Sequence, residues 1–259
     1  MKLTNNTILI TGGSNGIGLE LASQFLKLGN TVIITGRNLS KLNEVKRNFP
    51  GLNIFQSDAG NANNIKTLYE NVLKQFPELN VLINNAGIMR KLNLNDTSYD
   101  LENINQEIEI NLSGPIRMVN QFLPHLKTKK EATIVNVSSG LAFVPFPISP
   151  VYSATKAGVH FYTESLRIQL KKTNVKVFEL APPLTNTDLQ NAFTAEDMKG
   201  TTAMDTDKMV EIALKALSND IYEIRPGQSN LLKIMSRVAP QFILNQMSRP
   251  VDNLLAEGN

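Results

Sequence analysis

The stretch TILITGGSNGIGLEL, residues 7–21, leads from an apolar β-rich run through a glycine-rich turn into a helical pattern. Glycines in such a turn let the backbone approach a pyrophosphate, which then sits on the helix N-terminus. The G-x-x-x-G-x-G spacing departs from the generic G-x-G-x-x-G fingerprint, so its place in a first β-α turn carries the prediction. The alternative is a tight turn whose glycines serve only helix-strand packing. The expected nucleotide contacts in this turn are Gly12, Ser14, Asn15, Gly16, Ile17 and Gly18.

Short apolar runs alternate with amphipathic segments along most of the chain. The candidate strands are residues 7–11, 31–35, 52–57, 80–84, 132–138 and 175–180, with a short one at 221–224. Continuous rather than alternating hydrophobicity suits parallel strands that are covered on both faces. We therefore expect an α/β fold, a Rossmann-type doubly wound parallel sheet of about seven strands with helices on both faces. Residues 1–259 are expected to form one domain, in which about 190–259 make a C-terminal region for substrate, lid and subunit contacts.

Composition excludes several classes of function. The net charge of +3 is too small to indicate a nucleic-acid or membrane-surface partner. The chain has no cysteine and two histidines, so disulfides and a cysteine nucleophile are excluded and no metal site is predicted. No apolar run reaches the roughly 20 residues of a membrane helix. The N-terminus enters a strand pattern too early for a signal peptide, which makes a cytoplasmic location the expectation.

The end of the second predicted strand indicates which dinucleotide binds. An acidic residue there would hydrogen-bond the adenosine 2′-hydroxyl and favour NAD. This chain has Gly36 at that position and Arg37 next, and Arg37 could hold a 2′-phosphate through two parallel hydrogen bonds. The alternative for Arg37 is a solvated loop arginine. NADP is therefore predicted as the cofactor, with NAD second.

A second motif, YSATK at residues 152–156, places Tyr152 and Lys156 four residues apart, on one face of a helix. A surface pair is one explanation. The other is acid-base chemistry, in which the Lys156 ammonium, aided by the positive nicotinamide of the oxidised cofactor, stabilises the Tyr152 phenolate and lowers its pKa. Ser149 and Pro150 precede the pair and are typical of an N-cap and a first helical residue.

Together these pieces resemble the short-chain dehydrogenase/reductase family in its single-domain branch. The motifs that carry the resemblance are TGGSNGIG (11–18), DAGN (58–61), NNAG (84–87), IEINLSGP (108–115), VNVSSG (135–140) and YSATK (152–156). They cover about the first 190 residues and fall at the expected strand ends. Within the family, the stretch from Ser138 to Gly158 and the later LAPP (180–183) are most similar to the bacterial DltE-like oxidoreductases. That subgroup is named for an operon of teichoic-acid D-alanylation.

The resemblance implies a catalytic set of four residues. They are Asn111, Ser139, Tyr152 and Lys156. Ser139 would hydrogen-bond the substrate oxygen, and Asn111 would hold a water that relays protons toward Lys156. The family's serine lies thirteen residues before the tyrosine, which selects Ser139, while the adjacent Ser138 stays open as the alternative. From its residue type alone, Asn111 could instead be a helix-kink residue beside Gly114 and Pro115, and Ser139 an ordinary turn serine.

The resemblance also implies further cofactor contacts. In order along the chain they are Asp58, Ala59, Asn85, Ala86, Gly87, Thr185 and Thr187, with Tyr152 and Lys156 from the catalytic set. Asp58 would accept from the adenine amino group, and the two threonines would reach the nicotinamide carboxamide and the pyrophosphate. The chain departs from the family at Pro183, which stands where a glycine is usual and removes a backbone donor.

The substrate region is less defined. Leu141, Phe143, Val144 and Phe146 could wall a pocket for a largely apolar carbonyl compound or pack against the core, and both alternatives stay open. Met89 and Arg90 are further pocket candidates, and Arg90 would favour an anionic substrate group. His125 and His160 are expected to be structural or surface residues. Met204, Met209, Met235 and Met247 suggest a pliable lid or subunit surface in the C-terminal region.

The function predicted from these residues is an NADP(H)-dependent oxidoreductase that interconverts a carbonyl and an alcohol, with Tyr152 as general acid/base. Its partner would be a small-molecule substrate. By analogy with the family, helices at about 103–127 and 150–172 would form a homodimer or homotetramer. The alternative is a non-catalytic NADP-binding sensor or scaffold linked to teichoic-acid D-alanylation. The intact catalytic set favours the enzyme.

Overall fold

The computed structural model describes residues 1–96 and 101–256, and within them seven parallel strands form one sheet in the order β3-β2-β1-β4-β5-β6-β7. The strands are β1 (Thr7–Thr11), β2 (Thr31–Gly36), β3 (Asn53–Gln56), β4 (Leu79–Asn84), β5 (Ala132–Val137), β6 (Val175–Leu180) and β7 (Glu223–Ile224). The chain leaves β1 toward β2 and β3, returns to β4 on the other side of β1, and continues outward to β7. This confirms the predicted Rossmann-type doubly wound α/β fold.

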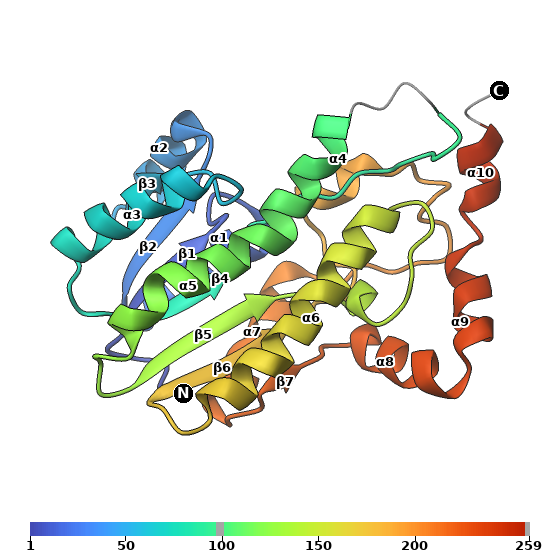
Figure 1. Cartoon of the computed structure of the whole chain (residues 1–259). Coiled ribbons are helices and arrows are strands. Elements are labelled where there is room, and N and C mark those ends of the chain that lie inside the picture. The colour runs from blue at the N-terminus through green and yellow to red at the C-terminus, as the bar shows by residue number, and fades with distance from the viewer. Residues whose placement is uncertain (97–100, 257–259) are drawn as a thin grey trace.

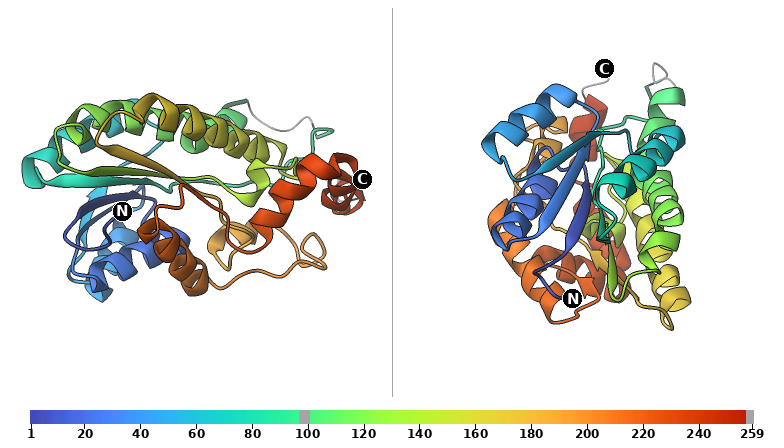
Figure 2. Two further views of the ribbon diagram at one scale, coloured as in Figure 1. Left: turned by 90° about the horizontal axis from the view of Figure 1, so that it is seen from below. Right: turned by 90° about the vertical axis from the view of Figure 1, so that its left-hand side faces the viewer.

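Helices cover both faces of the sheet (Figures 1 and 2). The helices are α1 (Gly16–Lys27), α2 (Leu39–Asn48), α3 (Ala62–Gln75), α4 (Leu101–Ile108), α5 (Gly114–Leu126), α6 (Pro150–Leu170), α7 (Thr206–Ser218), α8 (Gln228–Val238), α9 (Pro240–Met247) and α10 (Val251–Ala256). Helices α1, α2 and α7 pack on one face, and α3, α5 and α6 on the other. Every residue of β5 is buried, as expected for a central strand with both faces covered.

Each face has its own apolar core. Phe25 of α1 and Phe178 of β6 are completely buried in the first core, and Phe122 of α5 is completely buried in the second. Met209 of α7 also belongs to the first core, so the expectation of a surface position is wrong for this methionine. Large buried side chains on both faces hold the strands in position and fix where their carboxyl ends lie.

The expected helix at 103–127 is interrupted. Between α4 and α5 lies a π-helical turn, Glu109–Ser113, which contains Asn111. Helix α6, expected at 150–172, is continuous from Pro150 to Leu170. Beyond β7, helices α8, α9 and α10 follow one another along the right-hand side of the molecule in Figure 1. None of the helices in the described part of the chain is long and apolar enough to cross a membrane.

Candidate active site

A cavity of about 700 Å³ opens at the carboxyl ends of the strands. The predicted site residues that line it are Gly12, Ser14, Asn15, Gly16, Ile17, Arg37, Asp58, Ala59, Asn85, Ala86, Gly87, Ser139, Tyr152, Lys156, Thr185 and Thr187. Gly18 and Asn111 lie behind its wall. One elongated cavity therefore joins the glycine-rich turn to the Tyr152/Lys156 pair, which is the arrangement that a bound dinucleotide and its substrate require.

The glycine-rich turn is shaped by close backbone contacts. A Cβ on Gly18 would lie 2.3 Å from the Gly12 carbonyl oxygen, so Gly18 serves helix-strand packing. Gly12 has a φ of +65°, and a Cβ there would lie 2.8 Å from the Ala86 Cα. The side chain of Asn15, the residue before α1, donates to Asp188 and does not cap the helix. The first-turn amides of α1 thus keep their capacity to bind an anion, which fits a pyrophosphate.

Arg37 lies at the far end of the cavity from Tyr152, together with Ser14, Asn38 and Lys41. A Cβ on Gly36 would lie 3.3 Å from the Ser14 Oγ, so any side chain at Gly36, an acidic one included, would crowd Ser14. Lys41 forms a 3.2 Å ion pair with Asp188. Lys41 was not predicted as a site residue, although its position four residues after Arg37, in the first turn of α2, could have indicated it. Cations and hydroxyls at this end suit a phosphate group.

The strand ends next to the turn are fixed by Thr11. Its Oγ1 accepts hydrogen bonds from the amides of Asn85 and Ala86, at 3.0 and 3.1 Å. The Asn85 side chain donates to the carbonyls of Thr11 and Gly12, so it orients the turn as well as lining the cavity. The Asp58 carboxylate accepts from the Gly60 amide at 2.9 Å and still borders the cavity.

Tyr152 and Lys156 lie one turn apart on α6, and both side chains are buried. The Lys156 Nζ donates to the Val137 carbonyl at 2.9 Å and lies 5.5 Å from the centre of the Tyr152 ring. Ser149 precedes α6 as expected, but its hydroxyl makes no cap. It donates instead to the Arg90 carbonyl, because the loop after β4 passes within reach.

Burial dominates the acid-base properties of this pair. Desolvation raises the pKa of Tyr152 to about 12, while hydrogen bonding with Ser139 opposes that rise. Desolvation also lowers the pKa of Lys156 to about 8. The expected lowering of the Tyr152 pKa relied on the oxidised cofactor as well as on Lys156, and the chain alone shows the opposite shift. Removing a phenolate from water costs more than the interaction with Ser139 returns.

The two adjacent serines face different partners. The Ser139 hydroxyl lies close enough to Tyr152 to oppose the rise in its pKa, and it accepts from the Leu141 amide at 3.1 Å. The Ser138 hydroxyl donates to the Glu179 carboxylate at 2.5 Å, and this contact is buried. Ser139 therefore lies beside the predicted proton-transfer pair, whereas the Ser138 hydroxyl is bound to Glu179 of the neighbouring strand β6.

Asn111 lies in the π-helical turn, which agrees with the explanation as a residue of a helix irregularity, and it is fully buried. Its role in holding a relay water stays a prediction. Its Oδ1 accepts from the Ile88 amide at 2.9 Å, and its Nδ2 donates to the Ile88 carbonyl at 2.8 Å. Nδ2 also lies 3.3 Å from the Thr155 hydroxyl on α6. Asn111 thus ties the interrupted helix to the loop after β4 and to Thr155 of α6.

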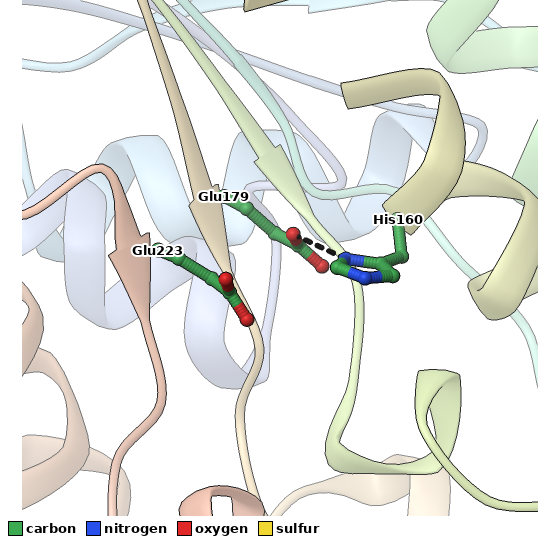
Figure 3. A group of neighbouring side chains, drawn as sticks. All are labelled: His160, Glu179 and Glu223. Atoms are coloured by element: carbon green, nitrogen blue, oxygen red, sulfur yellow. Dashed lines mark hydrogen bonds and ion pairs between the residues drawn. The ribbon is translucent and has the colours of Figure 1, made fainter. Parts of the chain in front are cut away.

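His160 is a structural residue, as expected, and it belongs to a buried polar cluster (Figure 3). Its Nδ1 lies 2.7 Å from Glu179, and Glu223 of β7 lies beside them. These three side chains could offer ligand atoms to a metal ion. The Lys233 ammonium of α8 already contacts Glu223 and supplies the positive charge that the two carboxylates need. This cluster links α6, the sheet edge and α8.

The apolar residues of the loop after Ser139 fall into two groups, one that lines the cavity and one that packs inside the protein. Leu141 and Phe146 line the cavity. Phe143 packs edge-on against His160, with ring centres 5.0 Å apart, and Val144 is buried away from the cavity. The predicted apolar wall is therefore half right.

Residues from outside this loop also line the part of the cavity expected to hold the substrate. Met89 lines the cavity as expected, and the sequence had not indicated Phe193 as a further wall residue. Met247 also lines it and packs against Phe146 in a small apolar cluster, which supports a pocket role for this methionine. The Arg90 side chain donates instead to Gln106, so the expectation that it faces the pocket is wrong.

The two prolines after β6 keep the local hydrogen bonding intact. The Pro182 carbonyl accepts from the Gly140 amide at 2.8 Å, and the Pro183 carbonyl accepts from the Thr185 hydroxyl at 2.8 Å. Both prolines border the cavity. The turn is therefore held through its carbonyl groups, which proline retains.

Fold and site together define a class of protein, and sequence comparison agrees with them. A family model described as short chain dehydrogenase matches residues 6–198. The chain belongs to the short-chain dehydrogenase/reductase family and is an oxidoreductase. It is 41% identical over 250 residues to a Bacillus subtilis (strain 168) protein named uncharacterized oxidoreductase DltE. That alignment covers 96% of this chain and 98% of the relative.

Solved structures of the family have the same fold. A short chain dehydrogenase from Burkholderia cenocepacia J2315, solved in complex with NADP, matches with a TM-score of 0.81 at 23% identity, covering 95% of this chain and 99% of that one. A 3-ketoacyl-(acyl-carrier-protein) reductase from Brucella melitensis, complexed with NADH, matches with a TM-score of 0.78 at 26% identity, covering 88% and 100%. The chain has relatives with either nicotinamide cofactor.

Proposed function

We propose that this chain is an NADP(H)-dependent oxidoreductase that interconverts a carbonyl and an alcohol, with Tyr152 as general acid/base. The observation that carries the proposal is the meeting of Ser139, Tyr152 and Lys156 inside the cavity that begins at the glycine-rich turn. A surface pair or a pure nucleotide-binding scaffold has no need for a buried phenol beside a buried amine. The nicotinamide of the bound cofactor supplies or accepts the hydride.

The residues suit reduction of the carbonyl. Tyr152 is protonated at neutral pH, because burial holds its pKa at about 12. It can give this proton to the substrate oxygen as negative charge develops there, since an alkoxide is more basic than a phenolate. The Ser139 hydroxyl would hydrogen-bond the same oxygen. The positive charge of Lys156 favours the phenolate that remains. Asn111 holds the loop and helix against which Lys156 is placed.

The role of Tyr152 can be tested by measuring NADPH oxidation against a panel of carbonyl compounds. Tyr152→Phe should lower kcat by about 10²- to 10⁴-fold, because proton transfer is lost while the ring is kept. Ser139→Ala should lower it by about 10²- to 10³-fold. Tyr162→Phe, on the same helix but outside the cavity, is the matched control and should retain activity. Tight NADPH binding with no turnover, and no change in Tyr152→Phe, would support a sensor or scaffold instead.

The preference for NADP over NAD is supported by the cations and hydroxyls around Arg37 and by Gly36 in place of an acid. Arg37→Ala should weaken NADPH binding roughly 10- to 100-fold, because a charge-assisted contact to the 2′-phosphate is lost. Its effect on NADH should be within about 3-fold. Arg47→Ala, an exposed residue on α2, is the control. Equal losses for the two cofactors in a fluorescence titration would refute the assignment.

A small-molecule substrate with a largely apolar body is proposed from the wall of Leu141, Phe146, Phe193 and Met247.

A homodimer or homotetramer is proposed from the outer face of α6, where Phe161 is 66% exposed. Phe161→Glu should then lower the mass measured by light scattering. A link to teichoic-acid D-alanylation is proposed from the resemblance to the DltE-like proteins, and a lid role of residues 190–259 from the methionines of that region. A cytoplasmic location stays a prediction from the sequence.

A further inference from the structure

Glu107 is a buried acid that the proposed reaction does not yet use. It lies on α4, one turn before Asn111, and is 3% exposed. Its Oε1 is buried and has no hydrogen-bond partner in the described part of the chain. Leaving a carboxyl oxygen buried without a partner costs stability, so the position needs an explanation beyond packing.

The groups around Glu107 place it beside the reaction centre. Helix α4 packs against α6, which carries Tyr152 and Lys156. The backbone amide and the charge of Arg90 and the charge of Lys156 all favour the ionised form of the Glu107 carboxyl. Burial outweighs these attractions and raises the pKa of Glu107 to about 7. The neighbouring acid, Glu109, pairs with Arg117 at the half-exposed side of the π-helical turn.

The coupling runs in both directions. The Glu107 charge raises the pKa values of Lys156 and Tyr152. Asn111 and Lys156 converge near Gly87, where a Cβ would lie 3.3 Å from the Asn111 Oδ1 and 3.5 Å from the Lys156 Nζ. Glu107, on the helix directly before the turn that carries Asn111, therefore senses the protonation state of Lys156.

We propose that Glu107 is the inner proton-exchange group of the site, which returns to Lys156 the proton used in reduction. The inference rests on the proposed function. As the substrate carbon accepts hydride, Tyr152 gives its proton to the substrate oxygen. The Tyr152 phenolate then takes a proton from the Lys156 ammonium, and the Lys156 amine takes one from the Glu107 carboxylic acid. The Glu107 carboxylate finally regains a proton from solvent. One proton enters for each carbonyl reduced, and oxidation of the alcohol runs the steps in reverse.

A pH profile separates this role from a structural one. The wild type should show an ionisation near 7 in kcat for carbonyl reduction with NADPH. Glu107→Gln should lose that ionisation and lower kcat at neutral pH by roughly 10- to 100-fold, with partial recovery in Glu107→Asp and on adding a small carboxylic acid. Glu109→Gln is the matched control and should leave the profile unchanged. An unchanged profile in Glu107→Gln, or an equal loss at every pH without recovery, would overturn the proposal.

A second measurement does not depend on turnover. In protein with ¹³C-labelled glutamate carboxyl groups, the signal that disappears in Glu107→Gln should titrate near 7. The same signal should titrate at higher pH in Lys156→Met, because the cation that favours the carboxylate is gone. Turnover together with an ordinary glutamate titration near 4 would overturn the relay alone. A wild type that reduces no carbonyl would overturn the proposed function and the relay with it.

Discussion

Replacing Lys156 with methionine should stabilise the protein while it abolishes activity. Lys156 is 4% exposed, and its ammonium donates to the Val137 carbonyl. Burial holds its pKa at about 8, below the ordinary value of 10.5. Attraction to Glu107 acts in the opposite direction but is the smaller effect. Methionine keeps much of the side chain's length and removes the charge that burial penalises.

The size of the effect follows from the pKa. A lowering from 10.5 to about 8, at about 1.4 kcal/mol for each pH unit, corresponds to roughly 3–4 kcal/mol. Below pH 8 the lysine is charged in both states, so the full penalty applies. Between about 8 and 10.5 the folded protein loses the proton first, and wild-type stability rises with pH. The advantage of Lys156→Met should therefore be largest near neutral pH and should disappear by about pH 10.5.

The assay is urea unfolding of both proteins without cofactor, at several pH values from 7 to 10.5. Lys171→Met, at the exposed end of α6, is the control and should change the free energy of unfolding by less than about 0.5 kcal/mol. The same Lys156→Met sample should reduce no carbonyl. A destabilised Lys156→Met, or a difference from wild type that does not change with pH, would show that the buried ammonium is better compensated than the structure indicates.

Three further substitutions test the site's architecture. Gly18→Ala should lower the free energy of unfolding by about 1–3 kcal/mol in urea titrations and weaken NADPH binding, because its Cβ would press on the Gly12 carbonyl. Ser138→Ala should cost about 1–3 kcal/mol by removing a buried donor to Glu179, yet it should leave kcat close to wild type. Pro183→Gly should lower stability by about 0.4–1 kcal/mol and change the Kd for NADPH less than about 3-fold, as measured by fluorescence.

The sequence predicted the strands well because each is a continuous apolar run between turns. The run at residues 132–138, for example, ends within one residue of β5. Side-chain direction was harder to predict. The choice between Ser138 and Ser139 depends on Glu179, which is distant in the sequence and reaches Ser138 only because β5 and β6 are paired. Spacing to Tyr152 favoured Ser139, and the hydrogen bonds agree.

Burial was the main property that the sequence concealed. Glu107 and Glu109 alternate in a polar stretch and both resemble surface residues, yet only Glu107 is buried. Its position four residues before Asn111 could have indicated a shared helix face. The rise in the Tyr152 pKa was missed for the same reason, because a motif shows which charges are near but not how much water has been removed.

The π-helical turn at Glu109–Ser113 changes the rotational phase of a long helical rod. An α-helix advances about 100° per residue, so one additional residue in a turn reorients everything that follows. Helix α4 consequently faces α6, while Met118 and Phe122 of α5 face the sheet. Deleting a single residue here would restore a regular helix, and either α4 or α5 would then be rotated away from the surface against which it packs. The π-helical turn therefore allows one nearly continuous helix to pack against α6 at its start and against the sheet at its end.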